Sequence, residues 1–195
     1  MLSFASYFDI KERKVSDLVW LVFGGAGAVT YLFEPPSQDV LLYVVCGIAI
    51  AIGCLRARIF GQADCLGLVA LAVVFPAYDG LPVAPLVAVA TPVLASICSL
   101  CYNLSCNISD LISGRLFYGI RERRHRKALA FVILHRKRRH ERFVFQAQVG
   151  NRFVFCFRSE TERKFAGDFE GYVSSAVPLM PFMLASLFMP LFSSL

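Results

Sequence analysis

The chain has 195 residues, of which 57% are hydrophobic and only 17% are charged, with seven cysteines and a formal net charge of +6. Soluble domains carry about 25% charged residues, so this composition argues against an ordinary soluble domain. The odd number of cysteines, most of them in or beside apolar stretches, argues against a disulfide scaffold. The composition is typical of a helical membrane protein.

Apolar residues concentrate in stretches separated by short polar turns. A bilayer core of about 30 Å needs about 20 helical residues, although tilt and snorkelling allow fewer. With their flanks, these stretches predict membrane-spanning helices, and a shorter helix ending near Lys11 raises the predicted number to six. The apolar stretches are residues 18–33, 40–55, 65–77, 81–104 and 173–192.

Basic residues give the predicted orientation, because Lys and Arg mark the cytoplasmic side of membrane proteins. All of them fall within residues 11–14, 56–58 and 115–164. Six crossings leave every one of these groups inside the cell. We therefore expect a polytopic α-helical protein of the cell membrane, with membrane helices 1–5 in residues 1–114, a cytoplasmic basic domain at 115–172 and membrane helix 6 at 173–195.

The cytoplasmic domain is expected to be a small β-rich insertion before the last helix. Residues 141–157, ERFVFQAQVGNRFVFCF, alternate aromatic or branched residues with others on both sides of Gly150-Asn151. Such runs, separated by two turn-forming residues, predict a β-hairpin. We expect a third strand at Ala128–Leu134.

Two basic clusters flank these strands, RERRHRK at residues 121–127 and HRKRRH at 135–140. Basic patches are typical of nucleic-acid binding, but juxtamembrane clusters also attract anionic lipids. The strands carry no RNA-binding signature. We therefore expect anionic membrane lipids as partners, and no nucleic acid.

Asp64 lies where the fourth membrane helix is expected to begin. Residues 65–77 alone make about 20 Å of helix, which is too short to span the core, whereas a start at Ile59 gives about 28 Å. That extension places Asp64 inside the helix, near its cytoplasmic end. Acids at such depth usually face a wet cavity and serve chemistry or transport. Gly61 and Ala63 leave room beside Asp64 for another backbone.

Asp9 is the second candidate acid, because it lies at the cytoplasmic end of the first predicted helix. Two neighbouring carboxyl groups cannot both ionise cheaply, so one keeps a proton. Such a pair can activate water and protonate a peptide carbonyl without a metal, a cofactor or a Ser or Cys nucleophile. The alternative is that each acid is a helix cap or surface charge, as we expect for Asp17 and Asp110.

A metal site is not expected. Cys98-x-x-Cys101 followed by Cys106 resembles part of a zinc motif. A structural zinc site normally has four ligands on a loop or knuckle, whereas these cysteines fall in a predicted apolar helix.

The segments DIKERKVSDLVW at residues 9–20 and GQAD at 61–64 together resemble the archaeal preflagellin and prepilin peptidases. These are type IV leader peptidases of the GxGD aspartic class. The first segment resembles their D-x-K/R-x-R-x-V/I-x-D-x-x-W sequence, and the second resembles Gly-x-Gly-Asp with Ala63 in place of the second glycine. Cys65-Leu66 also differs from many relatives, which have a small residue and Lys there.

The resemblance implies that Asp9 and Asp64 are the catalytic pair of an aspartic-type endopeptidase, with Gly61, Ala63 and Asp17 as supporting motif residues. It implies cleavage of short basic leader peptides from archaellin or type IV pilin-like precursors at the cytoplasmic membrane face. A basic leader also needs acidic contacts, for which we expect Glu160, Glu162, Asp168 or Glu170.

Two other classes of function stay open at this point. The chain could be a non-catalytic membrane assembly factor that holds pilin-like subunits. It could also be a small transporter with Asp64 as its proton or cation carrier, although no clear inverted repeat supports this.

Overall fold

The structure is a computed structural model that describes residues 1–13, 15–57, 60–139, 141, 143–155, 169–175 and 177–193. The chain forms two compact units. Unit 1 comprises Met1–Ala95 and Pro178–Leu195, and unit 2 comprises Ser96–Val177. The predicted domain boundaries were after residues 114 and 172, and the long helix α5 contributes residues to both units.

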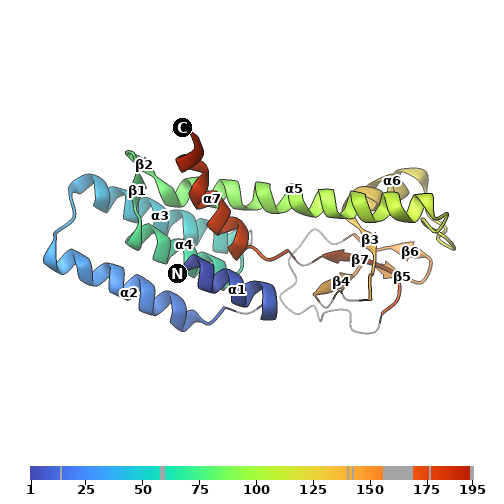
Figure 1. Ribbon diagram of the computed structural model, residues 1–195, viewed down its shortest axis with the longest axis horizontal. Coiled ribbons are helices and arrows are strands. Elements are labelled where there is room, and N and C mark those ends of the chain that lie inside the picture. The colour runs from blue at the N-terminus through green and yellow to red at the C-terminus, as the bar shows by residue number, and fades with distance from the viewer. Residues whose placement is uncertain are drawn as a thin grey trace. The chain divides into compact units, whose positions relative to one another are not determined.

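Unit 1 is built from helices and one short two-stranded ribbon. Helix α4 packs between α2 and α3, and α1 packs against α7 (Figure 1). The elements are α1 (Leu2–Glu12), α2 (Asp17–Phe33), α3 (Gln38–Arg56), α4 (Gln62–Val74), β1 (Ala77–Tyr78), β2 (Leu81–Pro82), the first part of α5 (Val83–Ile112) and α7 (Met180–Ser193).

Small residues allow α4 to lie at the centre of unit 1. A side chain on Gly47 of α3 would place its Cβ 2.5 Å from the Cβ of Ala72 on α4. Gly67 of α4 faces the ring of Trp20, and an added Cβ there would lie 3.2 Å from it. Close helix contacts of this kind depend on residues with little or no side chain. The packing fixes the helix that carries Asp64.

The prediction of six transmembrane helices is wrong. Among the described residues, only α3 and α5 are both long enough and apolar enough to cross a membrane, and α2 and α4 are apolar but shorter. Large apolar side chains on the outer faces of α2 and α3 are exposed, including Leu32, Phe33 and Leu42. The structure is therefore compatible with membrane association through two helices.

The other predicted spans are wrong because their helices are too short or start later than predicted. Helices α1, α4 and α7 have 11, 13 and 14 residues. At 1.5 Å per residue they cover about 16 to 21 Å, well short of a bilayer core. The last apolar stretch does not begin as a helix, because Tyr172–Ser175 forms strand β7 of a sheet. The predicted start of the fourth helix is also wrong, since α4 begins at Gln62 and Ile59 lies outside the described residues.

Unit 2 contains the predicted β structure. Strand β7 pairs antiparallel with both β3 (His135–Arg136) and β4 (Val144–Gln146). Strands β5 (Gln148–Val149) and β6 (Arg152–Phe153) form the hairpin predicted around Gly150-Asn151, which is confirmed. Gly150 has a φ of 57°, a conformation that glycine adopts without strain.

The predicted strand at Ala128–Leu134 is wrong, because these residues belong mainly to helix α6 (Arg124–Ile133). The side-chain amides of Asn103 and Asn107 on α5 donate to carbonyls at the C-terminal end of α6, among them those of Ile133 and Leu134. The last carbonyls of a helix lack partners within the helix. These long-range hydrogen bonds therefore favour a helix where the short apolar run alone suggested a strand.

Candidate active site

Asp9 lies in the last turn of α1, where the chain turns toward α2. Its backbone carbonyl accepts a hydrogen bond from the N–H of Arg13, which ends the helix in a left-handed conformation with a φ of 55°. The side-chain Oδ2 of Asp9 accepts a hydrogen bond of 3.0 Å from the backbone N–H of Met180. Met180 begins α7, so the Asp9 carboxyl group lies at the N-terminus of that helix.

Asp64 lies in the first turn of α4, three residues after the N-cap Gly61. Its Oδ2 accepts a hydrogen bond of 3.1 Å from the Gly61 backbone N–H. A Cβ at Gly61 would lie only 3.1 Å from that oxygen, so glycine leaves the carboxyl group room to fold back. The half-buried carboxyl group of Asp64 therefore caps its own helix.

The two carboxyl groups have different electrostatic environments. Burial raises the pKa of Asp64 to about 6, and the negative charge of Asp9 also raises it. The hydrogen bond from the Gly61 N–H lowers it by less. Burial also raises the pKa of Asp9, but the Met180 N–H and the Arg13 guanidinium act in the opposite direction. A helix N-terminus and a nearby cation both favour the ionised form. The structure thus brings the acids into electrostatic range, with Asp64 favoured as the proton carrier.

A cavity of about 790 Å³ opens next to this pair. Its lining includes the sequence neighbours of both acids, Phe8 and Ala63, but neither Asp9 nor Asp64 itself. The remaining wall comes from α1, the α1–α2 connection and the start of α2. It combines apolar groups with the charged groups of Glu12, Arg13 and Asp17. The cavity can therefore receive a ligand that is apolar in one part and cationic in another.

The three supporting motif residues either contact Asp64 or line the cavity. Gly61 holds Asp64, while Ala63 and Asp17 line the cavity. Asp17 is the first residue of α2, whose N-cap is Ser16. Asp110 is neither an N-cap nor a surface charge, because it is buried in the last turn of α5, where its Oδ1 pairs at 3.0 Å with the half-buried Arg138.

Of the four acids predicted to bind the leader, only Glu170 belongs to the described residues, and it does not line this cavity. Glu160, Glu162 and Asp168 lie outside the described residues. Glu170 is exposed and belongs to unit 2, where it lines a different cavity with basic residues such as Arg136 and Arg139.

Sequence reasoning missed Glu12 and Met180. Glu12 follows Asp9 by three residues on the same helix, and residues at that spacing share a face, so the helical period could have indicated it. No local signal relates Met180 to Asp9, because the two lie 171 residues apart.

Among the described residues, no cluster of three or more His, Cys, Asp or Glu side chains could hold a metal ion. Cys98 and Cys101 are both exposed on α5. No protein-family model, curated protein or solved structure shows a significant match to the chain.

Proposed function

We propose that the protein is an aspartic endopeptidase that removes short basic leader peptides from archaellin or type IV pilin-like precursors, with Asp9 and Asp64 as its catalytic pair. The observation that carries the proposal is the pairing itself. Two acids 55 residues apart in sequence each adjoin a residue that lines one cavity, Phe8 and Ala63, and the negative charge of Asp9 contributes to the raised pKa of Asp64.

The difference in environment between the acids suits peptide hydrolysis. Asp9, whose ionised form is favoured by the Met180 N–H and Arg13 against the effect of burial, accepts a proton from water as the water oxygen attacks the peptide carbonyl carbon. Asp64 donates its proton to the carbonyl oxygen, which gives a tetrahedral diol. As the C–N bond breaks, Asp9 donates its proton to the leaving amine nitrogen. A hydroxyl of the diol gives its proton to Asp64, which restores the starting state of both acids.

The cavity next to the pair supports the substrate class. Its aromatic and aliphatic wall, which includes Phe4 and Val19, suits the start of a precursor's apolar helix. The carboxylates of Glu12 and Asp17 suit the Lys or Arg residues of a leader. The resemblance of residues 9–20 and 61–64 to the archaeal preflagellin and prepilin peptidases supports the same substrate class.

We further propose that the protein is multi-pass and crosses the cell membrane through α3 and α5, with the acid pair at the cytoplasmic face. α3 ends at the basic residue Arg56. Basic residues at the ends of spans favour the cytoplasmic side. Asp64 follows Arg56 by eight residues, which supports its position at that face.

The test is cleavage of a precursor with a basic leader by membranes that contain the wild type, Asp9→Asn or Asp64→Asn. Both changes replace a titratable carboxyl group by an amide of nearly the same shape, which can act neither as the base nor as the acid. Asp39→Asn is the matched control, because Asp39 is an exposed acid in the first turn of α3, away from the cavity. We expect cleavage by the wild type and the control only.

Cleavage that survives both Asp9→Asn and Asp64→Asn would contradict the proposal. Failure of the wild type to cleave, combined with stable capture of the uncleaved precursor, would instead indicate an assembly factor. Proton or cation flux that depends on Asp64 alone would indicate a transporter.

A further inference from the structure

A second cavity, of about 770 Å³, lies in unit 2 and is strongly basic. It is lined by the segment between Ile120 and Lys127 and by Arg152 of strand β6. Five of the lining side chains are Arg or Lys and one is Glu, so their net charge is +4 with His125 neutral. Like charges that gather in one concavity repel one another, and a bound anion relieves that repulsion.

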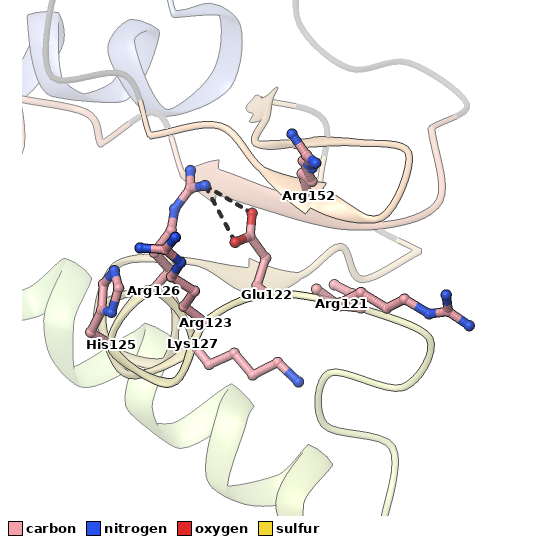
Figure 2. Close-up of a pocket in the computed structure, with 8 residues that line it drawn as sticks. Arg121, Glu122, Arg123, His125, Arg126, Lys127 and Arg152 are labelled. Carbon is pink, nitrogen blue, oxygen red and sulfur yellow. Dashed lines mark hydrogen bonds and ion pairs between the residues drawn. The ribbon is translucent and has the colours of Figure 1, made fainter.

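The frame of this cavity is an ion pair between Glu122 and Arg126. The Glu122 carboxylate accepts from Arg126 Nη1 at 3.0 Å (Figure 2). It also accepts from the Phe153 backbone N–H at 3.1 Å. Arg126 Nη2 also donates to the Phe153 carbonyl at 2.7 Å, and its guanidinium lies over the ring of Phe155. These contacts join the start of α6 to strand β6 and use the only carboxylate of the described lining.

The other cations of the lining are not neutralised in this way. Within the described part of the chain, none of their side chains forms an ion pair, and Figure 2 shows them spread around Glu122 and Arg126. All are exposed except Lys127, which is half-buried. They are Arg121, Arg123, Lys127 and Arg152, with His125 beside them.

The start of helix α6 adds to the positive potential. Arg123 is its N-cap residue and makes no side-chain capping bond. The first N–H groups of a helix lack acceptors within the helix, and a negative group near them is stabilised. Phosphate groups bind at such positions. The cavity thus combines unpaired cations, an uncapped helix start and a frame held by the Glu122–Arg126 pair.

We propose that this cavity binds a phosphate group with two negative charges, as in a phosphomonoester lipid headgroup or free inorganic phosphate. A compact dianion fits a concave site in which cations come from both the 121–127 segment and β6. The described lining contains no Phe, Tyr or Trp, whereas single-stranded nucleic acids usually stack their bases on such rings. The site is independent of the Asp9–Asp64 pair.

The test is isothermal titration of the full chain in a neutral detergent with three probes: dioctanoyl phosphatidic acid, dioctanoyl phosphatidylglycerol and inorganic phosphate. Phosphatidic acid carries a phosphomonoester and phosphatidylglycerol a singly charged diester. We expect phosphatidic acid to bind at least fivefold more tightly than phosphatidylglycerol. Inorganic phosphate that binds as tightly as phosphatidic acid would identify the free ion as the source of the ligand, and weaker binding would identify the lipid.

Variants distinguish a built site from a diffuse basic surface. Arg123→Gln, Lys127→Gln and Arg152→Gln should each weaken phosphatidic acid binding about fivefold, the effect expected for one cation near an anionic headgroup. Arg124→Gln is the matched control, because Arg124 is exposed on the same helical turn but does not line the cavity. Its effect should stay below about twofold, and all four variants should unfold at the wild-type temperature.

An equal loss for Arg124→Gln would overturn the proposal, since it would indicate general attraction by the basic surface. Equal binding of the two lipids would overturn it as well. A single-stranded oligonucleotide that binds more tightly than phosphatidic acid, and is weakened by the same lining variants, would overturn it in favour of a nucleic-acid site.

Discussion

The Oδ2 of Asp9 accepts a hydrogen bond of 3.0 Å from the backbone N–H of Met180, which joins the last turn of α1 to the first residue of α7. Asp9 therefore has a structural role in addition to its proposed catalytic one. Asp9→Ala should lower the free energy of unfolding by about 1 kcal/mol, the usual loss when a helix N-terminus loses its side-chain acceptor. Asp9→Asn keeps an acceptor oxygen, so its free energy of unfolding should fall by less than that of Asp9→Ala. Thermal unfolding of the two variants gives the comparison.

The same pair of variants separates stability from chemistry. Asn at this position cannot act as a base, so Asp9→Asn should be as inactive as Asp9→Ala despite its higher stability. Activity that tracks the unfolding temperature across the two variants would show that Asp9 acts through structure alone.

The pH dependence of cleavage should reflect the proton on Asp64. Its pKa is about 6, and the proposed mechanism needs the protonated form of Asp64 together with the ionised form of Asp9. As pH rises through 6 the acid is lost, so kcat/KM should fall about tenfold for each further pH unit. The measurement is kcat/KM from pH 5 to pH 8 on a leader peptide whose own groups do not titrate in that range. A flat profile would contradict the assignment of Asp64 as the acid.

Asp64→Asn should stabilise the fold while it removes activity. A carboxyl whose pKa rises from 3.8 to about 6 on folding is destabilising above pH 6, where it is ionised in both states. That shift corresponds to roughly 3 kcal/mol, so the variant should gain on the order of that amount at pH 8. The gain should shrink below pH 6 and vanish below about pH 4, where both states are protonated.

The control for this stability measurement is Asp39→Asn, which removes an exposed acid at the start of α3. Unfolding temperatures at a series of pH values should diverge from the wild type for Asp64→Asn only. A loss of stability in Asp64→Asn at pH 8 would show that its hydrogen bond to Gly61 outweighs the burial of its charge.

Glu12 should contribute to recognition of basic leaders. It lines the cavity next to the acid pair and is exposed, and exposed ion pairs contribute up to about 1 kcal/mol. Glu12→Gln should therefore raise KM for a basic leader by up to about fivefold and leave kcat unchanged. Glu34→Gln, which changes an exposed acid outside the cavity, is the control. The KM effect should disappear with a leader whose Lys and Arg are replaced by Gln.

Local features were predictable from the sequence, but features set by distant partners were not. Gly150-Asn151 predicted its hairpin because the turn conformation depends on those residues themselves. The predicted number of six membrane helices was wrong, because the hydropathy of a stretch does not indicate at which residue a helix starts. Val173, read as the start of an apolar helix, instead pairs in a sheet with His135 and Gln146.

In the candidate site, too, the acids could be predicted from local sequence, but their distant contacts could not. Asp9 and Asp64 could be singled out because an acid at the end of an apolar helix is unusual in itself. The predicted start of the Asp64 helix at Ile59 was wrong, since Gly61 is the N-cap of α4 and the helix begins at Gln62. The hydrogen bond from Met180 depends on how α7 packs against α1, which no local pattern encodes.

Gly47 should tolerate even a methyl group poorly, because it sets the distance between α3 and the helix that carries Asp64. A Cβ there would lie 2.5 Å from the Cβ of Ala72 and 3.0 Å from that of Ala84, so Gly47→Ala must push α4 away. Overpacking of this kind costs about 1–3 kcal/mol. Gly53→Ala is the matched control in the same helix, because nothing lies within 4 Å of the added atom. It should stabilise α3 by about 0.5–1 kcal/mol through helix propensity alone. The unfolding temperature should fall for Gly47→Ala and rise for Gly53→Ala. Equal shifts of the unfolding temperature in the two variants would contradict the close contact of α3 with α4.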